Sequence, residues 1–434
     1  MNVMSKSQPN AAQPLAFAEA NASNAAPEPR YARRAEGMKA SEIRELLKVL
    51  GRPGIISFGG GIPDPALFPV EAVKAAYDAV LSDPAKAAAG LQYSVSEGYE
   101  PLREWIAAHM ASLGVPCRTD NIVVTSGSQQ ALEFLGKLFL TEGDTALVEA
   151  PTYLGAIQAF CAYEPRYDVI TPEHGNRTPA SYREAAAMPI AGSPSGGEVK
   201  FIYTVPDFAN PTGATLSVQA RDGLLDLARD LDVPVLEDTA YSALRFEGEP
   251  VPCLQAIDVA RNGGDIDRSR VIYCGTFSKT LTPGLRIGWV CAAEPIVKRL
   301  VLIKQASDLN VSSINQMVMT EIAQRSYEAQ VARARTFYRS RRDAMLAALE
   351  EHMPEGVTWV RPEGGLFVWM TLPDRFDGRT LLARAVEEHN VAFVPGSAFF
   401  VGDQGRNTIR LSYSLPPEDR IAEGIARLGR LLKS

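Results

Sequence analysis

The chain has 434 residues, of which 46% are apolar and 22% charged, a balance typical of a globular protein with a sizeable core. Its formal net charge of -7, without any basic cluster, argues against a nucleic-acid partner and favours a small ligand. The five scattered cysteines include no Cys-x-x-Cys pair, and the four histidines show no metal-ligand spacing. These counts argue against a disulfide framework, a metal site and a serine or cysteine triad.

The N-terminal segment, residues 1–35, is rich in Ala, Asn, Pro and Ser and contains no long apolar run. We predict that it is a flexible tail, and a cleaved targeting peptide is the alternative. No later stretch has the roughly twenty consecutive apolar residues that a membrane-spanning helix needs. The cysteine pattern indicates a reducing compartment, so the expected location is the cytoplasm, away from any membrane.

Apolar spacing predicts a helix over residues 38–50 and a short strand over residues 55–58, which leads into the three glycines 59–61. Consecutive glycines permit a sharp turn or a close approach, so this loop is expected to face a ligand or to join two domains. No helix follows at the spacing of a dinucleotide-binding motif. The next helix is predicted over residues 69–81.

From residue 121 onward, seven short apolar runs alternate with helical stretches. The runs cover residues 122–124, 146–149, 167–170, 201–205, 233–237, 271–274 and 287–291. This alternation predicts an α/β fold with a mostly parallel, seven-stranded sheet covered by helices. We assign residues 71–314 to this large domain.

A long, arginine-rich amphipathic helix is predicted over residues 315–350. After it, residues 357–360, 365–370 and 408–413 alternate like antiparallel strands, with helices over residues 378–388 and 418–432. These elements predict a small α+β domain formed by residues 315–434 and completed by residues 36–70.

The stretch Arg270–Trp289 contains the main chemical signal. A buried-strand run ends in small hydroxylic residues and leads to Lys279, and the chain turns before it reaches Arg286. Open α/β sheets bind ligands at the carboxyl ends of their strands, where a partly desolvated lysine can form a Schiff base with an aldehyde cofactor. Thr276 and Arg286 are groups that suit a phosphate ester. The alternative is a surface lysine, with Arg286 in an ion pair.

A second signal follows the first of the seven runs, where a turn of small residues leads into a predicted helix at Ser128 and Gln129. Backbone amides and hydroxyls at a helix N-terminus point toward an anion, so this turn is the expected main cradle for a phosphate. An ordinary serine N-cap explains the same residues equally well.

Polar residues also follow later strands: Asn210 in an Asn-Pro-Thr-Gly turn, then Asp238, with Tyr241 three residues further on. A pyridine cofactor needs an anion beside its ring nitrogen and donors beside its ring oxygen. Asp238 would keep the ring nitrogen protonated, Asn210 and Tyr241 would bond the ring oxygen, and Tyr153 would stack on the ring. Lys279 would carry a proton between the substrate carbon and the cofactor.

Near the C-terminus, Arg410 lies within an apolar strand. An arginine buried without a partner is costly, so a carboxylate is expected beside it, either from the protein or from the substrate. Because Arg410 occurs together with the other motifs, we favour the carboxylate of the substrate as its partner.

Together these motifs resemble the class I and II aminotransferases, which are fold-type I pyridoxal-phosphate enzymes, from about residue 38 to the C-terminus. The resemblance implies pyridoxal 5′-phosphate as cofactor, with amino acids and 2-oxo acids as substrates. It assigns cofactor attachment and catalysis to Lys279, the pyridinium contact to Asp238, the ring oxygen to Asn210 and Tyr241, the phosphate region to Ser128, Gln129, Thr276 and Arg286, stacking to Tyr153 and the substrate α-carboxylate to Arg410.

Two further features refine the resemblance. Tyr93 is similar to a tyrosine that reaches the phosphate of the neighbouring subunit, which implies a homodimer with shared sites. The segments around Arg44 and Gly61 are similar to the 2-aminoadipate and kynurenine branch, in which Arg44 would take a distal carboxylate. This implies 2-oxoglutarate as acceptor and 2-aminoadipate, glutamate, an aromatic or a long-chain amino acid as donor.

Two alternatives to a transaminase stay open. The same fold also supports other pyridoxal-phosphate reactions, namely decarboxylation and β-elimination. A transcriptional regulator with an aminotransferase-like ligand domain is the third hypothesis, although such proteins need a basic winged-helix module before the fold.

Overall fold

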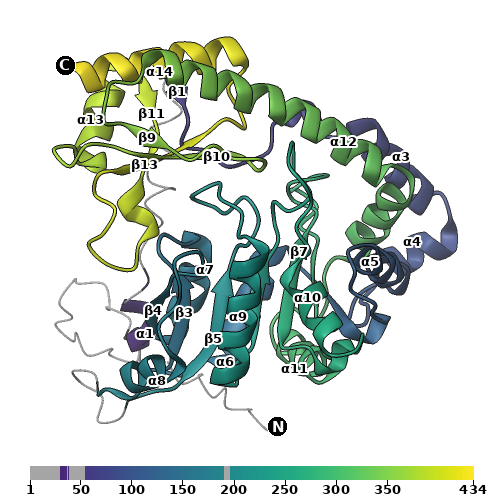
Figure 1. Cartoon of the computed structure of the whole chain (residues 1–434). Helices are drawn as coiled ribbons and strands as arrows, with labels where there is room; N and C mark the ends of the chain where they lie inside the picture. Colours follow the sequence, from purple (N-terminus) through teal and green to yellow (C-terminus); the bar gives the residue numbers. More distant parts are fainter. Residues whose placement is uncertain (1–29, 37, 39–53, 190–195) are drawn as a thin grey trace, which may run out of the picture.

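The computed structural model describes residues 30–36, 38, 54–189 and 196–434. Its largest sheet has seven strands in the order β2-β8-β7-β6-β5-β3-β4 (Figure 1). The strands are β2 (Ile122–Thr125), β3 (Thr145–Glu149), β4 (Arg166–Ile170), β5 (Val199–Thr204), β6 (Val235–Asp238), β7 (Val271–Thr276) and β8 (Gly288–Cys291). Only β8 runs in the direction opposite to the other six strands, so the predicted mostly parallel seven-stranded sheet is confirmed.

Helices cover both faces of this sheet, which explains why its strands are apolar on both sides. Alternate strand residues such as Val148, Leu236 and Ile272 belong to the core on one face, and Leu147 and Val235 to the core on the other. The first face is covered by α6 (Ser128–Phe139), α7 (Leu154–Phe160) and α11 (Glu294–Gln305), and the second by α5 (Glu100–Ser112), α8 (Pro179–Ala187), α9 (Val218–Leu231) and α10 (Leu254–Arg261).

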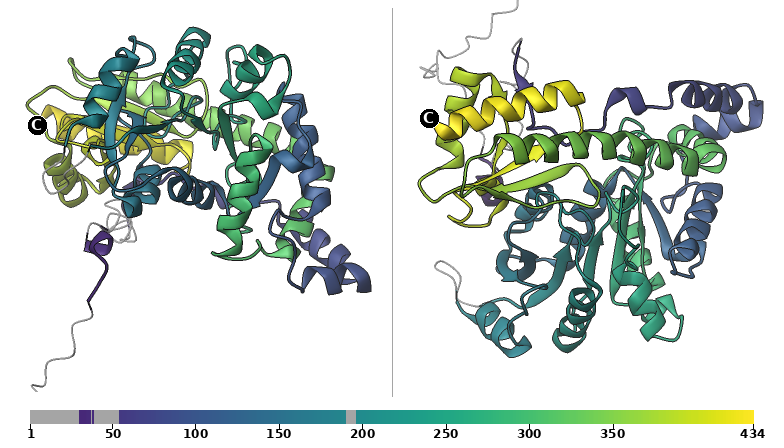
Figure 2. Two further views of the ribbon diagram at one scale, coloured as in Figure 1. Left: turned by 90° about the horizontal axis from the view of Figure 1, so that it is seen from below. Right: turned by 45° about the horizontal axis from the view of Figure 1, so that its top comes forward.

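A helix of 40 residues, α12 (Ser313–His352), crosses one end of the molecule (Figure 1). The predicted helix over residues 315–350 lies inside it. At one end α12 packs against α3 (Val70–Leu81), α4 (Pro84–Gly90) and α5, and at the other against the C-terminal helix α14 (Glu418–Lys433), which lies along it (Figure 2). No helix among the described residues is both long enough and apolar enough to cross a bilayer.

A second, antiparallel sheet has four strands in the order β12-β13-β10-β9. Its strands are β9 (Thr358–Trp359), β10 (Phe367–Thr371), β12 (Val394–Pro395) and β13 (Thr408–Ser412), and α13 (Gly378–His389) and α14 flank it. The three antiparallel strands and two helices predicted after α12 are therefore present. Together with the seven-stranded sheet they form the predicted α/β fold with a smaller α+β part.

The N-terminal part of the described chain pairs with its C-terminal part. The strand β1 (Ile56–Ser57) runs parallel to β11 (Val391–Ala392), and the 59–61 loop follows directly. The predicted helix over residues 38–50 lies outside the described residues, and the domain boundaries stay a prediction. Within the predicted tail, Arg33–Glu36 forms the short helix α1, and Arg33 bridges to Glu142 at 2.5 Å and Glu164 at 3.0 Å.

Candidate active site

The polar residues that follow the strands of the large sheet meet at one edge. They lie at the carboxyl ends of parallel strands or in the turns that follow, which is where open α/β sheets bind ligands. A cavity at this edge is lined by Ser128, Gln129, Tyr153, Val205, Asn210, Asp238, Ala240, Tyr241, Thr276, Ser278, Lys279, Pro283 and Arg286. All of the predicted cofactor-binding residues except Tyr93 therefore share one cavity.

Lys279 follows β7 and extends its amine across the cavity. The amine donates to the backbone oxygen of Gly61 at 3.1 Å and lies 5.7 Å from the centre of the Tyr241 ring. Burial, reinforced by the nearby positive charge of Arg410, lowers the pKa of the lysine to about 8, although Asp238 acts in the opposite direction. At this pKa roughly a tenth of the amine is neutral at pH 7, far more than for an ordinary lysine, and the neutral form is the one that acts as a nucleophile or a proton acceptor.

Asp238 ends β6 with one carboxylate oxygen paired and the other free. Oδ2 accepts a hydrogen bond of 3.0 Å from the hydroxyl of Tyr203, and Oδ1 is buried without a hydrogen-bond partner among the described residues. Burial raises the pKa of this carboxyl to about 6, against the effects of the Tyr203 hydroxyl, the Ala240 amide and Lys279. A buried acceptor without a partner is rare, and a protonated ring nitrogen is the kind of donor that would satisfy it.

The role of Tyr203 was not predicted from the sequence. It lies inside an apolar strand run, and its pairing with Asp238 requires that β5 and β6 be neighbours with these side chains on the same face. A hydroxyl within a buried strand is the only signal that the sequence offers, and many buried tyrosines have no functional role.

Arg410 comes from β13 of the second sheet and is 2% exposed. Its Nη1 donates to Oδ1 of Asn210 at 2.6 Å, and Nη2 donates to the backbone oxygens of Gly59 at 3.0 Å and Gly60 at 3.4 Å. Among the described residues, these hydrogen bonds go to an amide oxygen and two backbone oxygens and none to a carboxylate, and Nε of Arg410 has no hydrogen bond. The guanidinium therefore keeps an unneutralised positive charge beside the cavity.

The rings of Phe367 and Phe399 flank this guanidinium, with their centres 4.3 and 4.9 Å from its central carbon. Burial lowers the pKa of Arg410 to about 10, which still leaves it charged at neutral pH. The two rings were not predicted as part of the site, since each is an ordinary apolar strand or loop residue in the sequence. Aromatic rings at these distances attract a cation through their π electrons and so help to hold the buried guanidinium in place.

The end of the cavity beside α6 is suited to an anion. Gly127 precedes the helix with a φ of 77°, so Ser128 is the first helical residue and not the cap that one interpretation of the sequence required. A Cβ at Gly127 would lie 2.6 Å from Nη2 of Arg286, so only glycine lets this guanidinium reach the helix terminus. The hydroxyls of Thr276 and Ser278, 2.9 Å apart, complete the group. Helix amides, hydroxyls and a guanidinium together form a typical phosphate site.

Tyr153 and Gln129 form one side wall of the cavity. The Tyr153 hydroxyl donates to Oε1 of Gln129 at 3.4 Å, and Nε2 of Gln129 donates to the backbone oxygen of Gly155 at 2.7 Å. Burial raises the pKa of the phenol to about 12, so the ring stays neutral. A neutral aromatic ring whose hydroxyl is fixed by a hydrogen bond is suited to stacking against a flat ligand.

Three further predicted residues are Tyr93, Gly61 and Arg44. Tyr93 is 79% exposed and does not line the cavity of its own chain. Gly61 contacts the site only through its backbone oxygen, which accepts from Lys279, and a Cβ on it would lie 2.8 Å from the ring of Phe367. Arg44 lies outside the described residues.

The chain matches the family Aminotransferase class I and II over residues 54–428. It is 42% identical to aromatic-amino-acid aminotransferase 1 of Thermococcus litoralis, over 93% of this chain and 94% of that one. It is 41% identical to 2-aminoadipate transaminase of Thermus thermophilus, over 97% and 98%. The crystal structure of the α-aminoadipate aminotransferase of that organism, complexed with N-(5′-phosphopyridoxyl)-L-leucine, superimposes with a TM-score of 0.81 at 39% identity and covers 93% of this chain and 97% of its own.

The cavity fits pyridoxal 5′-phosphate on its own chemistry. Lys279 offers an amine for the aldehyde, the free oxygen of Asp238 an acceptor for the ring nitrogen, and the start of α6 with Arg286 a site for the phosphate. The chain belongs to the class I and II aminotransferases and is a pyridoxal-phosphate-dependent transaminase.

Proposed function

We propose that this transaminase moves the amino group of 2-aminoadipate, glutamate, an aromatic or a long-chain amino acid to a 2-oxo acid such as 2-oxoglutarate, in a ping-pong reaction. The observation that carries the proposal is the buried guanidinium of Arg410, which has no carboxylate partner among the described residues and lies beside the amine of Lys279 and the side chain of Asn210. Every α-amino acid and 2-oxo acid has a carboxylate adjacent to its reacting carbon, and Arg410 is the residue that we propose binds it.

When bound, pyridoxal 5′-phosphate supplies a protonated ring that stabilises negative charge at the substrate Cα. In the proposed mechanism, Asp238 keeps that ring nitrogen protonated through its ionised carboxylate, while Asn210 and Tyr241 orient the ring oxygen. Tyr153 covers one face of the ring and excludes water from it. Ser128, Gln129, Thr276 and Arg286 hold the phosphate and so fix the distance between the ring and the lysine.

Lys279 has two roles in this proposal. Its amine would hold the cofactor covalently at rest and would become free once a substrate amine takes its place. The free amine, with a pKa lowered to about 8, would accept the proton from the substrate Cα and would later donate it back on the side of the cofactor. A pKa close to the working pH suits a group that must both accept and donate a proton.

The proposed donors follow from the substrates named for the relatives, which are aromatic amino acids for one and 2-aminoadipate for the other. Arg44 is proposed to bind the distal carboxylate of the dicarboxylic substrates, and Gly61 to leave room for the substrate beside Phe367. A pocket that accepts both an aromatic ring and a carboxylate requires that the charged side chain, here proposed to be Arg44, leaves the pocket when an aromatic ring binds.

We also propose that the protein acts as a homodimer in which Tyr93 contacts the phosphate of the neighbouring subunit. On the single chain, Tyr93 is 79% exposed, and the nearby Leu91 and Val95 are 73% and 58% exposed. Three large apolar side chains within five residues are unusual on a free surface, and a second copy of the chain would cover them.

The half-reaction tests the proposed function. Purified holoenzyme mixed with each donor should lose the absorption band of the pyridoxal form and gain that of the pyridoxamine form, and 2-oxoglutarate should reverse the change. Borohydride reduction and peptide mapping should place the label on Lys279, and Lys279→Ala should abolish turnover without unfolding. Release of CO₂, or of pyruvate and ammonia without an acceptor, would instead indicate a decarboxylase or a lyase, and the absence of any cycle across the donor panel would refute the proposal.

A further inference from the structure

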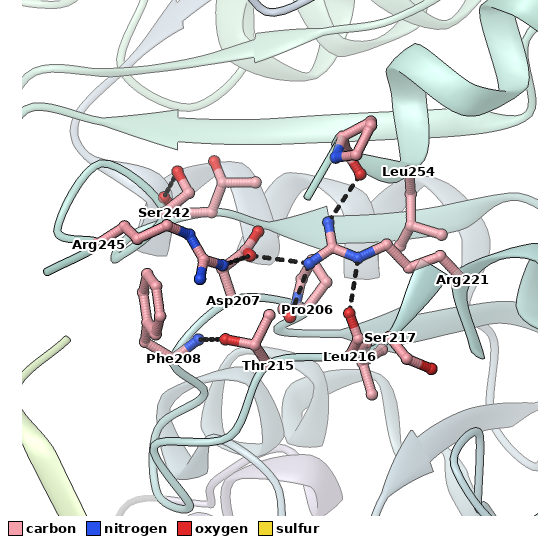
Figure 3. A network of polar contacts seen from close by, with 12 residues as sticks. Pro206, Asp207, Phe208, Thr215, Leu216, Ser217, Arg221, Ser242, Arg245 and Leu254 are labelled. Atoms are coloured by element: carbon pink, nitrogen blue, oxygen red, sulfur yellow. Dashed lines mark hydrogen bonds and ion pairs between the residues drawn. The ribbon is translucent and has the colours of Figure 1, made fainter. Parts of the chain in front are cut away.

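Arg221 is a fully buried arginine of α9 that has no role in the proposed mechanism. Its Nη2 donates to the backbone oxygen of Pro206 at 3.1 Å and to Oδ1 of Asp207 at 2.8 Å, while Nε donates to the oxygen of Leu216 at 3.1 Å and Nη1 to that of Pro252 at 2.9 Å (Figure 3). Burial of a guanidinium is costly unless such partners compensate, so this set of contacts is a built feature of the fold.

Two of these acceptors lie at opposite ends of a single turn, residues 206–216. Nη2 binds the oxygen of Pro206, Nε binds that of Leu216, and the amide of Leu216 donates to the oxygen of Pro206 at 2.8 Å. The guanidinium therefore closes the base of the turn (Figure 3). Because one rigid, planar group holds both ends, neither end can move without losing a charge-assisted hydrogen bond.

The tip of this turn carries Asn210. Within the turn, the amide of Ala209 donates to the backbone oxygen of Ala214 at 2.9 Å and so holds the two sides of the turn together. Phe208 adopts a φ of 49°, which a bulky residue rarely does. Asn210 then accepts 2.6 Å from Nη1 of Arg410. The position of the Asn210 side chain thus depends on a turn whose base is fixed by Arg221.

The charge of Arg221 is balanced by a chain of ion pairs that reaches the second sheet. Asp207 is shared by Arg221 at 2.8 Å and Arg245 at 3.6 Å, and Arg245 donates to Glu363 at 2.8 Å. Glu363 precedes β10, the strand that contributes Phe367, which flanks Arg410. Through Asp207 and Arg245, Arg221 is thus connected to the sheet that carries Arg410.

We infer that Arg221 is a positioning residue that sets the location of Asn210 between Arg410 and the cofactor ring, and thereby controls binding of the substrate carboxylate. This inference rests on the roles proposed above for Asn210 and Arg410. The competing explanation is that Arg221 only stabilises the fold, in which case its replacement would lower stability without a selective effect on the site.

The test compares two buried arginines in the holoenzyme. Arg221→Lys keeps the charge but loses the planar fork, and Arg342→Lys is the matched control. Arg342 is 2% exposed in α12 and likewise binds a carboxylate, that of Glu247 at 2.7 Å, and a backbone oxygen, that of Pro362 at 2.8 Å. Asp207→Asn, which keeps the shape of its side chain, replaces Arg221→Lys if that variant does not fold.

We expect both lysine variants to have lower melting temperatures, but only Arg221→Lys to raise the KM for amino-acid donors about 10-fold and to shift the pH at which the cofactor's visible absorption band titrates. In a double-mutant cycle, the effect of Arg221→Lys on KM should largely disappear in an Asn210→Ala background, since the two residues act through one element. Equal KM values for Arg221→Lys and Arg342→Lys, or additive effects in the cycle, would overturn the inference. A wild-type enzyme that shows no half-reaction would instead refute the proposed function.

Discussion

The acid–base properties of the site depend on single buried contacts. Asp238 is 3% exposed, and burial raises its pKa to about 6, toward the range in which it would lose its charge. The Tyr203 hydroxyl opposes this effect through one hydrogen bond to Oδ2. The carboxylate must be ionised to hold a protonated ring nitrogen, so its charge at neutral pH depends partly on a tyrosine that does not touch the cofactor.

Tyr203→Phe should therefore weaken cofactor binding in a pH-dependent way. Without the hydroxyl, the pKa of Asp238 rises further, so a larger fraction is protonated at pH 6, whereas the carboxyl stays ionised at pH 8.5. A hydrogen bond to a charged group contributes about 2 kcal/mol, so the affinity at pH 6 should fall by at least roughly 10-fold relative to wild type, with a much smaller loss at pH 8.5. Fluorescence titration of the cofactor-free protein measures both values.

Tyr182→Phe is the control for this prediction. Tyr182 is also fully buried, and its hydroxyl donates to the backbone oxygen of Val169 at 3.1 Å, away from the cavity. It should lose stability without a pH-dependent loss of cofactor affinity. An equal loss of cofactor affinity in Tyr203→Phe at both pH values would contradict the role given to the Tyr203 hydroxyl.

Arg410→Lys should raise the KM for amino-acid donors about 100-fold. Lysine keeps the charge but cannot form two parallel hydrogen bonds to a carboxylate, and disruption of a buried charge pair costs about 3 kcal/mol. Steady-state kinetics with an amino acid and with the corresponding amine, which lacks the carboxylate, separates binding from folding effects. If the substitution raises the KM for the amine as much as the KM for the amino acid, Arg410 is not the carboxylate ligand.

At the scale of elements, the site is assembled from turns that follow strands and from one loop that belongs to neither large sheet. The backbone oxygens of the 59–61 loop accept hydrogen bonds from both Lys279 and Arg410. The glycines of this loop are not equivalent. A Cβ on Gly61 would lie 2.8 Å from the Phe367 ring, whereas one on Gly60 would only approach Leu415 at 3.4 Å.

Gly61→Ala should therefore lower kcat/KM by about 10-fold or more, while Gly60→Ala should change it less than roughly threefold. The added methyl at position 61 displaces either the loop or the Phe367 ring, and overpacking of this kind costs about 1–3 kcal/mol. Steady-state kinetics of the two variants with the same donor provides the comparison. Indistinguishable variants would show that the position of the Gly61 carbonyl is unimportant to Lys279.

At the scale of the whole molecule, the segment with Leu91, Tyr93 and Val95 follows α4 and contacts the start of α12, where the hydroxyl of Ser313 donates to the backbone oxygen of Gln92 at 3.2 Å. This contact holds an apolar segment outward at the surface. In the proposed dimer, a second subunit would bury this segment. Tyr93 would then contact the active site of the neighbouring subunit and not that of its own chain.

Leu91→Glu should weaken the proposed dimer, because burial of a carboxylate in an apolar interface is costly. Sedimentation velocity should show more monomer, and activity should fall with dilution as the dimer dissociates. The control is Val218→Glu, at an exposed position at the start of α9, which should change neither property. A monomeric wild-type protein with full activity would contradict the proposed shared site.

The sequence by itself determined the elements and most of the chemistry of this protein, because both depend on local patterns. Apolar runs predicted all seven strands of the large sheet to within two residues at each end, and the residues that follow them could be assigned to one edge because parallel strands end together. Lys279, Asp238 and Asn210 were identifiable because each follows such a run.

Only the tertiary structure decided which residues from distant parts of the chain lie against one another. The bond from Tyr203 to Asp238, the two rings beside Arg410 and the closure of the 206–216 turn by Arg221 all join segments whose pairing leaves no periodic signal. Packing in three dimensions selects such contacts, since the same tyrosine, phenylalanine or arginine elsewhere in a core would have an identical local sequence. These contacts bear on the charge of Asp238 and on the surroundings of Arg410 and Asn210, which the local motifs do not specify.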